Sequence, residues 1–97
     1  MSTAFSEEKA KVALAELSGW ELSDGKNFIE KSFAFNDFLS AMEFMNKVAI
    51  VAEEMNHHPN WFNVYNRVDV ALTTHSADGI TQLDFDMAKS MDDIAGA

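Results

Sequence analysis

Three histidines surround one predicted hairpin, and they are the residues of this chain best suited to chemistry. His57 and His58 precede Pro59, and His75 follows the second predicted strand of the hairpin. The chain has no other histidine. Because the unperturbed pKa of histidine is about 6.5, its side chain can both give and accept a proton near neutrality. The pattern therefore predicts proton transfer, provided that the fold brings the imidazoles together.

The hairpin predicts how the histidines face each other. If Tyr65 and Val68 flank a two-residue loop, His58 lies directly opposite His75. Cross-strand partners have Cβ atoms roughly 4.5–5.5 Å apart, so the two imidazoles could share one small ligand. By strand alternation His75 projects from the more polar face of the sheet. His57 is predicted to end a helix, where the dipole favours the charged imidazolium and so suits a general acid.

Two other interpretations of the histidines stay open. A single histidine is more often a satisfied polar residue than a catalytic one, although a cluster of titratable groups favours function. A zinc site could combine the three histidines with Glu53 or Glu54. Against this site, the adjacent His57 and His58 would point in different directions, and the usual four-residue spacing of ligands is absent. A nucleophilic cysteine is excluded, because the chain has no cysteine.

The composition predicts one folded domain, 1–97, with few classes of partner. The chain is 47% hydrophobic, and 97 residues suffice for a single modest core. A net charge of −9 argues against nucleic acid and against an anionic membrane surface, since both require basic patches. Neither a secretory signal nor an apolar stretch long enough to span a bilayer is predicted. We therefore expect a cytoplasmic protein, which the absence of cysteine also suits.

Seven elements are expected to position the histidines, in the order α-β-β-α-β-β-α. The caps are Ser6 for the first helix, Asn36 or Asp37 for the second, and a Thr-x-x-Asp capping box at 81–84 for the third. The predicted ranges are 6–17, 20–22, 28–35, 38–57, 61–65, 68–74 and 81–94. This order predicts an α+β fold with helices packed on a four-stranded antiparallel sheet.

The central helix carries a wide apolar stripe. Its apolar residues follow one another at three- and four-residue steps, and neighbours widen the stripe: Phe38, Met42, Met45, Ala49 and Ala52, with Val48, Val51 and Met55 beside them. A stripe this wide predicts two partners, the sheet on one side and another subunit on the other. A long core helix in a monomer is the alternative, and the sequence leaves both open.

A longer motif unites these segments. It runs Glu53-x-x-x-His57-His58-Pro59, Trp61-Phe62-Asn63-Val64-Tyr65-Asn66, Thr74-His75, Gly79 and Asp84. This motif resembles that of the pterin-4a-carbinolamine dehydratase family, and the resemblance extends outwards to Gly19-Trp20 and the Phe-rich strand and helix. It covers nearly the whole chain, and the motif is long and mixed in residue type, so the resemblance is specific.

The resemblance implies a fold, an assembly and a reaction. The fold is a four-stranded antiparallel sheet with helices on one face, assembled as a homodimer or homotetramer through helices. The reaction removes water from 4a-hydroxytetrahydropterin to give quinonoid dihydropterin, which recycles the pterin after aromatic amino acid hydroxylation without a metal or other cofactor. Some animal members also serve as dimerisation cofactors of a homeodomain transcription factor. A pterin-dependent hydroxylase or a transcription factor is therefore an implied partner, and an interaction module acting through the central helix is the alternative function.

The resemblance also implies the substrate-binding residues. They lie on two sides of the pterin: Asn56, His57 and His58 on one, and Thr73, Thr74, His75 and Ser76 on the other. Asn56 departs from the Asp expected in animal members. Loss of the 4a-hydroxyl needs an acid for the leaving oxygen and a base for a ring N–H proton, each worth about 10²–10⁴-fold.

We predict roles for the three histidines on this basis. His57 and His75 form the acid–base pair, and His58 orients the pterin by a hydrogen bond; the sequence does not assign acid and base within the pair. Glu53 lies one turn before His57, so it either orients this imidazole or is a solvated charge on the helix surface. Asp84 is expected to cap the last helix.

Overall fold

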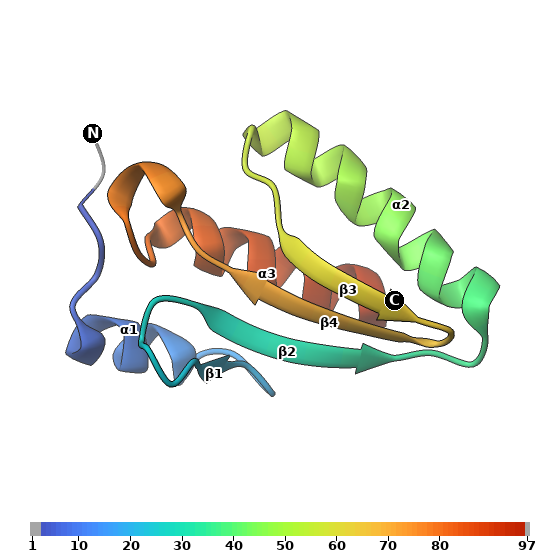
Figure 1. The fold of residues 1–97 in the computed structure, drawn as a ribbon, viewed down its shortest axis with the longest axis horizontal. Helices are drawn as coiled ribbons and strands as arrows, with labels where there is room; N and C mark the ends of the chain where they lie inside the picture. The colour runs from blue at the N-terminus through green and yellow to red at the C-terminus, as the bar shows by residue number, and fades with distance from the viewer. Residues whose placement is uncertain (1–2, 97) are drawn as a thin grey trace.

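The computed structural model describes residues 3–96 and contains a four-stranded antiparallel sheet with helices on one face (Figure 1). Its elements follow in chain order: α1 (Glu7–Leu14), β1 (Glu21–Leu22), β2 (Ile29–Ala34), α2 (Phe38–Met55), β3 (Asn60–Val64), β4 (Arg67–Leu72), the 3₁₀ helix η1 (His75–Ala77) and α3 (Gln82–Gly96). The predicted order α-β-β-α-β-β-α is confirmed, with η1 as an addition.

The strands lie in the order β1-β2-β4-β3, so β1 and β3 are the edges of the sheet. Side chains alternate along β2, where Ile29 and Phe33 are buried and their neighbours are more exposed. Val68, Val70 and Leu72 point to the same side from β4. This face packs against α2 and α3, which places the core between the sheet and these helices (Figure 1).

Two predicted caps fix where helices begin. The Ser6 hydroxyl oxygen accepts from the Lys9 backbone N–H at 3.1 Å, and the Asp37 carboxylate accepts from the Ser40 N–H at 2.8 Å. Hydrogen bonding from Ser40 lowers the pKa of Asp37 below its usual range. Helix α1 ends at Leu14, three residues earlier than predicted, because the chain continues as tight turns that carry it towards β1.

The core-facing row of α2 differs from the predicted stripe. The buried residues are Ala41, Phe44, Val48 and Ala52, whereas Ala49 is exposed and Phe38 keeps 44% of its surface accessible. The predicted stripe was centred on the wrong side of the helix. The reason is that α2 carries apolar residues on more than one side. Leu39 and Ile50, which are 77% and 63% exposed, form a second apolar row on the outer side.

The β3–β4 turn lies one residue earlier than predicted. Val64 pairs with Arg67, so the two-residue loop is Tyr65–Asn66. Tyr65 adopts a left-handed φ of 49°, and the Asn66 side-chain amide donates to the Phe35 carbonyl at 2.8 Å. This bond anchors the loop beside the end of β2, which selects the observed position.

Moving the turn shifts the strand pairing by two residues. Asn60 pairs with Ala71, and β4 ends at Leu72. Neither His58 nor His75 belongs to the ladder, so their predicted cross-strand pairing is wrong. The two histidines are instead positioned by the segments that follow α2 and β4.

A polar cluster joins α3 to the first part of the sheet. The Trp20 indole Nε1–H donates to the Asp92 carboxylate at 3.0 Å, and the Lys31 ammonium lies 2.7 Å from the same group. This cluster is remote in sequence from the histidine segments. No helix among residues 3–96 combines the length and apolar character needed to cross a bilayer.

Candidate active site

The end of α2 sets the position of His57. Asn56 takes a left-handed φ of 51°, which ends the helix at Met55, and the His57 N–H closes the last turn on the Ala52 carbonyl at 3.0 Å. His57 therefore lies just beyond the helix. The prediction that His57 is the last residue of the helix is wrong. Its side chain turns inwards and is only 8% exposed.

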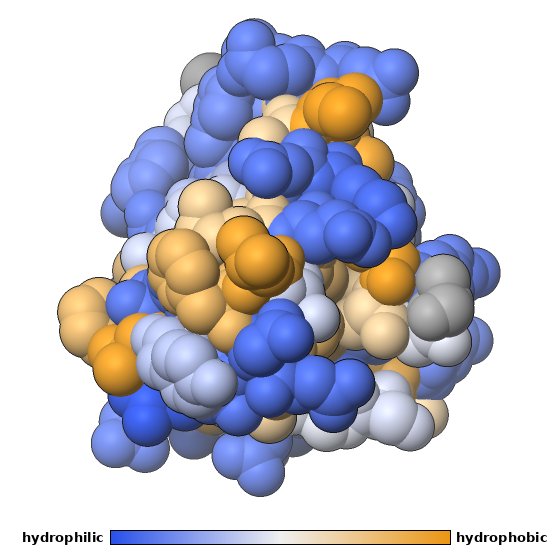
Figure 2. Space-filling model, turned by 90° about the vertical axis from the view of Figure 1, so that its right-hand side faces the viewer, coloured by the Kyte–Doolittle hydropathy of each residue, from blue (hydrophilic) through white to orange (hydrophobic). Residues whose placement is uncertain are grey.

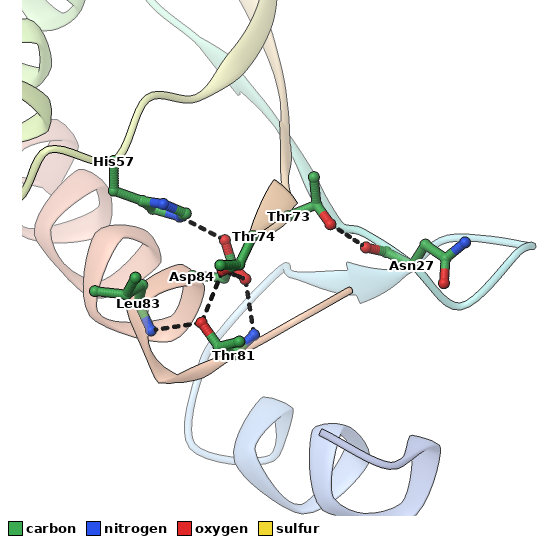
Figure 3. Close-up of polar contacts among 7 residues, drawn as sticks. All are labelled: Asn27, His57, Thr73, Thr74, Thr81, Leu83 and Asp84. Atoms are coloured by element: carbon green, nitrogen blue, oxygen red, sulfur yellow. Dashed lines mark hydrogen bonds and ion pairs between the residues drawn. The ribbon is translucent and has the colours of Figure 1, made fainter. Parts of the chain in front are cut away.

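The imidazole of His57 contacts a buried carboxylate. Its Nε2 lies 2.7 Å from Oδ1 of Asp84, which is fully buried in the first turn of α3. The other oxygen of Asp84 accepts from the Thr81 backbone N–H at 2.9 Å and from the Thr74 hydroxyl at 2.8 Å (Figure 3). The predicted capping role of Asp84 is confirmed, and the contact with His57 adds a second role.

The donors around Asp84 define where the protons lie. The Thr74 hydroxyl gives its proton to Asp84, so the 2.7 Å contact between Thr74 and Thr81 requires the Thr81 hydroxyl as donor. An ionised carboxylate only accepts, so the proton of a neutral His57 belongs on Nε2. Nδ1 of His57 has no hydrogen-bond partner among the described residues. This arrangement leaves Nδ1 as the nitrogen that can exchange a proton with a ligand.

His58 faces the opposite way from His57. Its Nε2 lies 2.5 Å from Oε2 of Glu53, and both side chains are exposed. Glu53 thus pairs with His58, and the predicted alternative in which it orients His57 is wrong. An exposed pair of this kind contributes little to stability.

His75 begins η1 directly after the buried Thr74. The Thr74 backbone bonds in both directions with Gly79, at 2.8 and 3.3 Å, which closes the loop that carries His75. The imidazole is exposed, as is Ser76 beside it. The predicted placement of His75 on the polar face of the sheet is wrong, because strand alternation stops at Leu72.

The predicted substrate-binding residues divide into two groups. Asn56, His58, His75 and Ser76 are exposed, whereas His57, Thr73 and Thr74 are buried. The Thr73 hydroxyl donates to the Asn27 carbonyl at 2.7 Å and the Thr74 hydroxyl donates to Asp84 (Figure 3). Both threonine hydroxyls are therefore engaged by the protein and support the site from behind.

Comparison with known proteins shows to which family the chain belongs. Residues 3–94 match the family model described as pterin 4 alpha carbinolamine dehydratase. The chain belongs to this family. The predicted resemblance to this family is confirmed.

Relatives in the family cover most of this chain. A Rhizobium johnstonii protein provisionally named pterin-4-alpha-carbinolamine dehydratase is 55% identical over 82 residues, which are 84% of this chain and 81% of the relative. A Brucella ovis protein with the same provisional name is 51% identical over 93% of each chain. A crystal structure from Brucella melitensis, described as a transcriptional coactivator/pterin dehydratase, superposes with a TM-score of 0.95 at 49% identity, covering 97% of this chain and all of that chain.

A metal centre and a surface hollow are the two alternatives to a histidine site. No group of three or more histidine, cysteine, aspartate or glutamate side chains within residues 3–96 is arranged to hold a metal ion. A hollow over the open face of the sheet is lined by Glu30, Phe62 and Asp69, among others, and contains no histidine. We take the His57–Asp84 cluster as the candidate site, because it contains an imidazole, which can give and accept a proton near neutrality, whereas the titratable groups around the hollow are carboxylates and a lysine.

Proposed function

We propose that this chain removes water from 4a-hydroxytetrahydropterin by histidine acid–base catalysis, giving quinonoid dihydropterin in pterin recycling. The observation that carries the proposal is the buried His57–Asp84 contact, which lies next to the His75 loop in a chain of this family. We also propose a cytoplasmic location, which a cysteine-free sequence suits.

The reaction needs only proton transfers. As the bond between C4a and the hydroxyl oxygen breaks, an acid protonates that oxygen, and a ring nitrogen supplies the electron pair that forms the new double bond. A base then takes the ring N–H proton, so the products are quinonoid dihydropterin and water. His57, acting through Nδ1, and His75 share the acid and base roles in this proposal.

The remaining exposed residues hold the pterin. His58 orients the substrate with a hydrogen bond, and the exposed Asn56 and Ser76 contact it from its two sides. Thr73 and Thr74 contribute to the binding site by supporting it, since their hydroxyls bond to Asn27 and Asp84 and the Thr74 backbone bonds to Gly79. No metal or covalent intermediate is required, because the substrate provides its own electron pair.

The test is dehydration of synthetic 4a-hydroxytetrahydropterin by metal-free protein. H57A and H75A should each lower kcat by about 10²–10⁴-fold, the usual contribution of one positioned acid or base. Y65A is a matched control, since Tyr65 is an exposed ring at the tip of the hairpin. Wild-type rates in both histidine variants would overturn the proposal.

A second candidate function, association through α2, rests on a different surface. Leu39 and Ile50 expose most of their apolar side chains on the outer side of this helix, with Met42 between them. Figure 2 shows apolar side chains separated by hydrophilic ones at the end of the molecule where α2 begins and the β3–β4 hairpin turns. We propose that this row joins copies of the chain into a homodimer or homotetramer, and that a transcription factor is an alternative occupant.

Ile50 is the residue with which to test this association. Met45, on the same helix, packs partly against the core, so a charge there would also disturb folding. I50E should shift the sedimentation coefficient to that of a smaller species, whereas the exposed V12E on α1 should leave it unchanged. An identical sedimentation coefficient for wild type and I50E would contradict association through this row.

A further inference from the structure

Residues 4–6, here called the N-terminal strap, lie against the segment that follows the His75 loop. The Phe5 backbone N–H donates to the Ile80 carbonyl at 2.7 Å. The Phe5 ring stacks on Phe85, with ring centroids 5.6 Å apart and planes 17° from parallel. Since Phe85 directly follows Asp84, the strap contacts the segment after the His75 loop and the neighbour of the residue that holds His57.

Gly79 permits a very close approach between the loop and the strap. A Cβ atom placed on Gly79 would lie 2.9 Å from the Cβ of Ala4, closer than real Cβ atoms come to a neighbour. Gly79 does not have a left-handed φ, so the requirement for glycine here comes from packing. Any side chain at this position would push the strap and the loop apart.

The position of His75 depends on the backbone of its loop. Its imidazole has no hydrogen-bond partner within residues 3–96 and is exposed. The loop is closed by Thr74, which bonds to Gly79, and its interior turn is formed by the Asp78 N–H donating to the His75 carbonyl at 3.1 Å. One side of this loop is held by the buried Thr74–Asp84 contact, and the other side ends at Gly79 against Ala4.

We infer that the N-terminal strap positions His75 for catalysis, and that the Ala4–Gly79 contact is where it does so. The catalytic part of this inference rests on the proposed function, whereas the effect of the strap on the loop does not. A strap that only stabilised the fold would alter the midpoint of unfolding and leave the loop and the turnover unchanged. A positioning role predicts changes in both at temperatures where the protein stays folded.

A double-mutant cycle between Ala4 and Gly79 tests the contact. G79A adds the atom that collides with Ala4, so the strap should shift and the loop amides should exchange with deuterium about tenfold faster. Misplacing a reacting group by a fraction of an ångström should lower kcat about tenfold. A4G should be close to wild type, and A4G/G79A should restore both quantities because it removes the colliding Cβ.

Two further variants separate positioning from general destabilisation. F5A weakens the strap from its other side, without adding an atom, and should change loop exchange and kcat in the same direction as G79A. W20F removes the indole bond to Asp92 in a different cluster and should lower the unfolding midpoint without changing loop exchange. If G79A does not fold, F5A measured against W20F decides the inference.

The outcomes are distinguishable from those of the proposed function. Unchanged loop exchange in G79A and F5A would overturn the inference, as would a loss of kcat in G79A that A4G fails to restore. Faster loop exchange that A4G reverses, together with unchanged dehydration in both G79A and H75A, would support the effect of the strap on the loop and overturn the proposed function.

Discussion

Nε2 of His57 lies 2.7 Å from the buried carboxylate of Asp84, although the two residues are 27 positions apart in the chain. This contact joins the segment after α2 to the first turn of α3. It also fixes one tautomer of the imidazole, because the remaining donors around Asp84 come from Thr74 and Thr81. A histidine held in this way presents a single nitrogen to a ligand.

Removing the negative charge of Asp84 tests this arrangement. D84N replaces a carboxylate, which only accepts hydrogen bonds, with an amide whose N–H₂ group would face other donors. A buried polar group is then left unsatisfied, so the free energy of unfolding should fall by about 1–3 kcal/mol. The His57 proton should no longer be confined to Nε2, which nitrogen-15 NMR of the imidazole measures. We expect kcat to fall as well. A tautomer unchanged from wild type would contradict the role of Asp84.

The Thr74 hydroxyl can be tested with a matched pair of variants. T74V keeps the shape of the side chain but removes the donor to Asp84, and it should cost about 1–3 kcal/mol of unfolding free energy. T74S keeps the hydroxyl and should lose less. Equal stability of the two variants in urea unfolding would show that the hydroxyl contributes nothing.

The Glu53–His58 pair should affect binding more than stability. Both side chains are exposed, so E53Q should change the free energy of unfolding by less than about 0.5 kcal/mol. If His58 orients the pterin, loss of its partner should raise KM and leave kcat nearly unchanged. The comparison is a steady-state titration of E53Q beside E54Q, which alters the neighbouring exposed glutamate.

The cap of α2 predicts a dependence of stability on acid. Since hydrogen bonding from Ser40 lowers the pKa of Asp37 in the folded state, ionised Asp37 stabilises the fold above the ordinary aspartate pKa of about 3.9. This contribution is lost as the pH falls through the folded-state value. The difference in Tm between wild type and D37A should therefore shrink in acid. D37N keeps a side chain that can cap the helix but cannot ionise. The difference in Tm between D37N and D37A should therefore stay the same as the pH falls through the range in which Asp37 titrates.

Much of the fold could be predicted because its signals are local. Ser6, Asp37 and the capping box at 81–84 bond to residues two or three positions away, so their patterns identify helix starts directly. The alternation along β2 likewise needs no distant partner. These features account for the correct order of helices and strands.

The errors came from contacts between distant parts of the chain. The position of the hairpin turn depends on the hydrogen bond from Asn66 to Phe35. Local spacing in the sequence does not predict a bond between residues so far apart. The side of α2 that faces the sheet was ambiguous, since apolar residues occupy both sides. The capping box identified Asp84 as a cap, whereas its contact with His57 depends on how the whole chain folds.

Asn27 was missed for a related reason. It contributes a backbone carbonyl to Thr73, and a carbonyl group gives no signal of its own in a sequence. The exposed residues of the site, by contrast, were found by residue type and by resemblance to the family. Their role in binding the pterin stays a prediction until a ligand is bound.

The left-handed residue at Asn56 has a consequence for how the two neighbouring histidines can evolve. By reversing the chain at that point, it sends one imidazole into the interior and its immediate neighbour into solvent. The inner imidazole is therefore constrained by a buried carboxylate, whereas the outer one contacts only the exposed Glu53. Across relatives we accordingly expect substitutions to accumulate at the outer position while the inner one is retained.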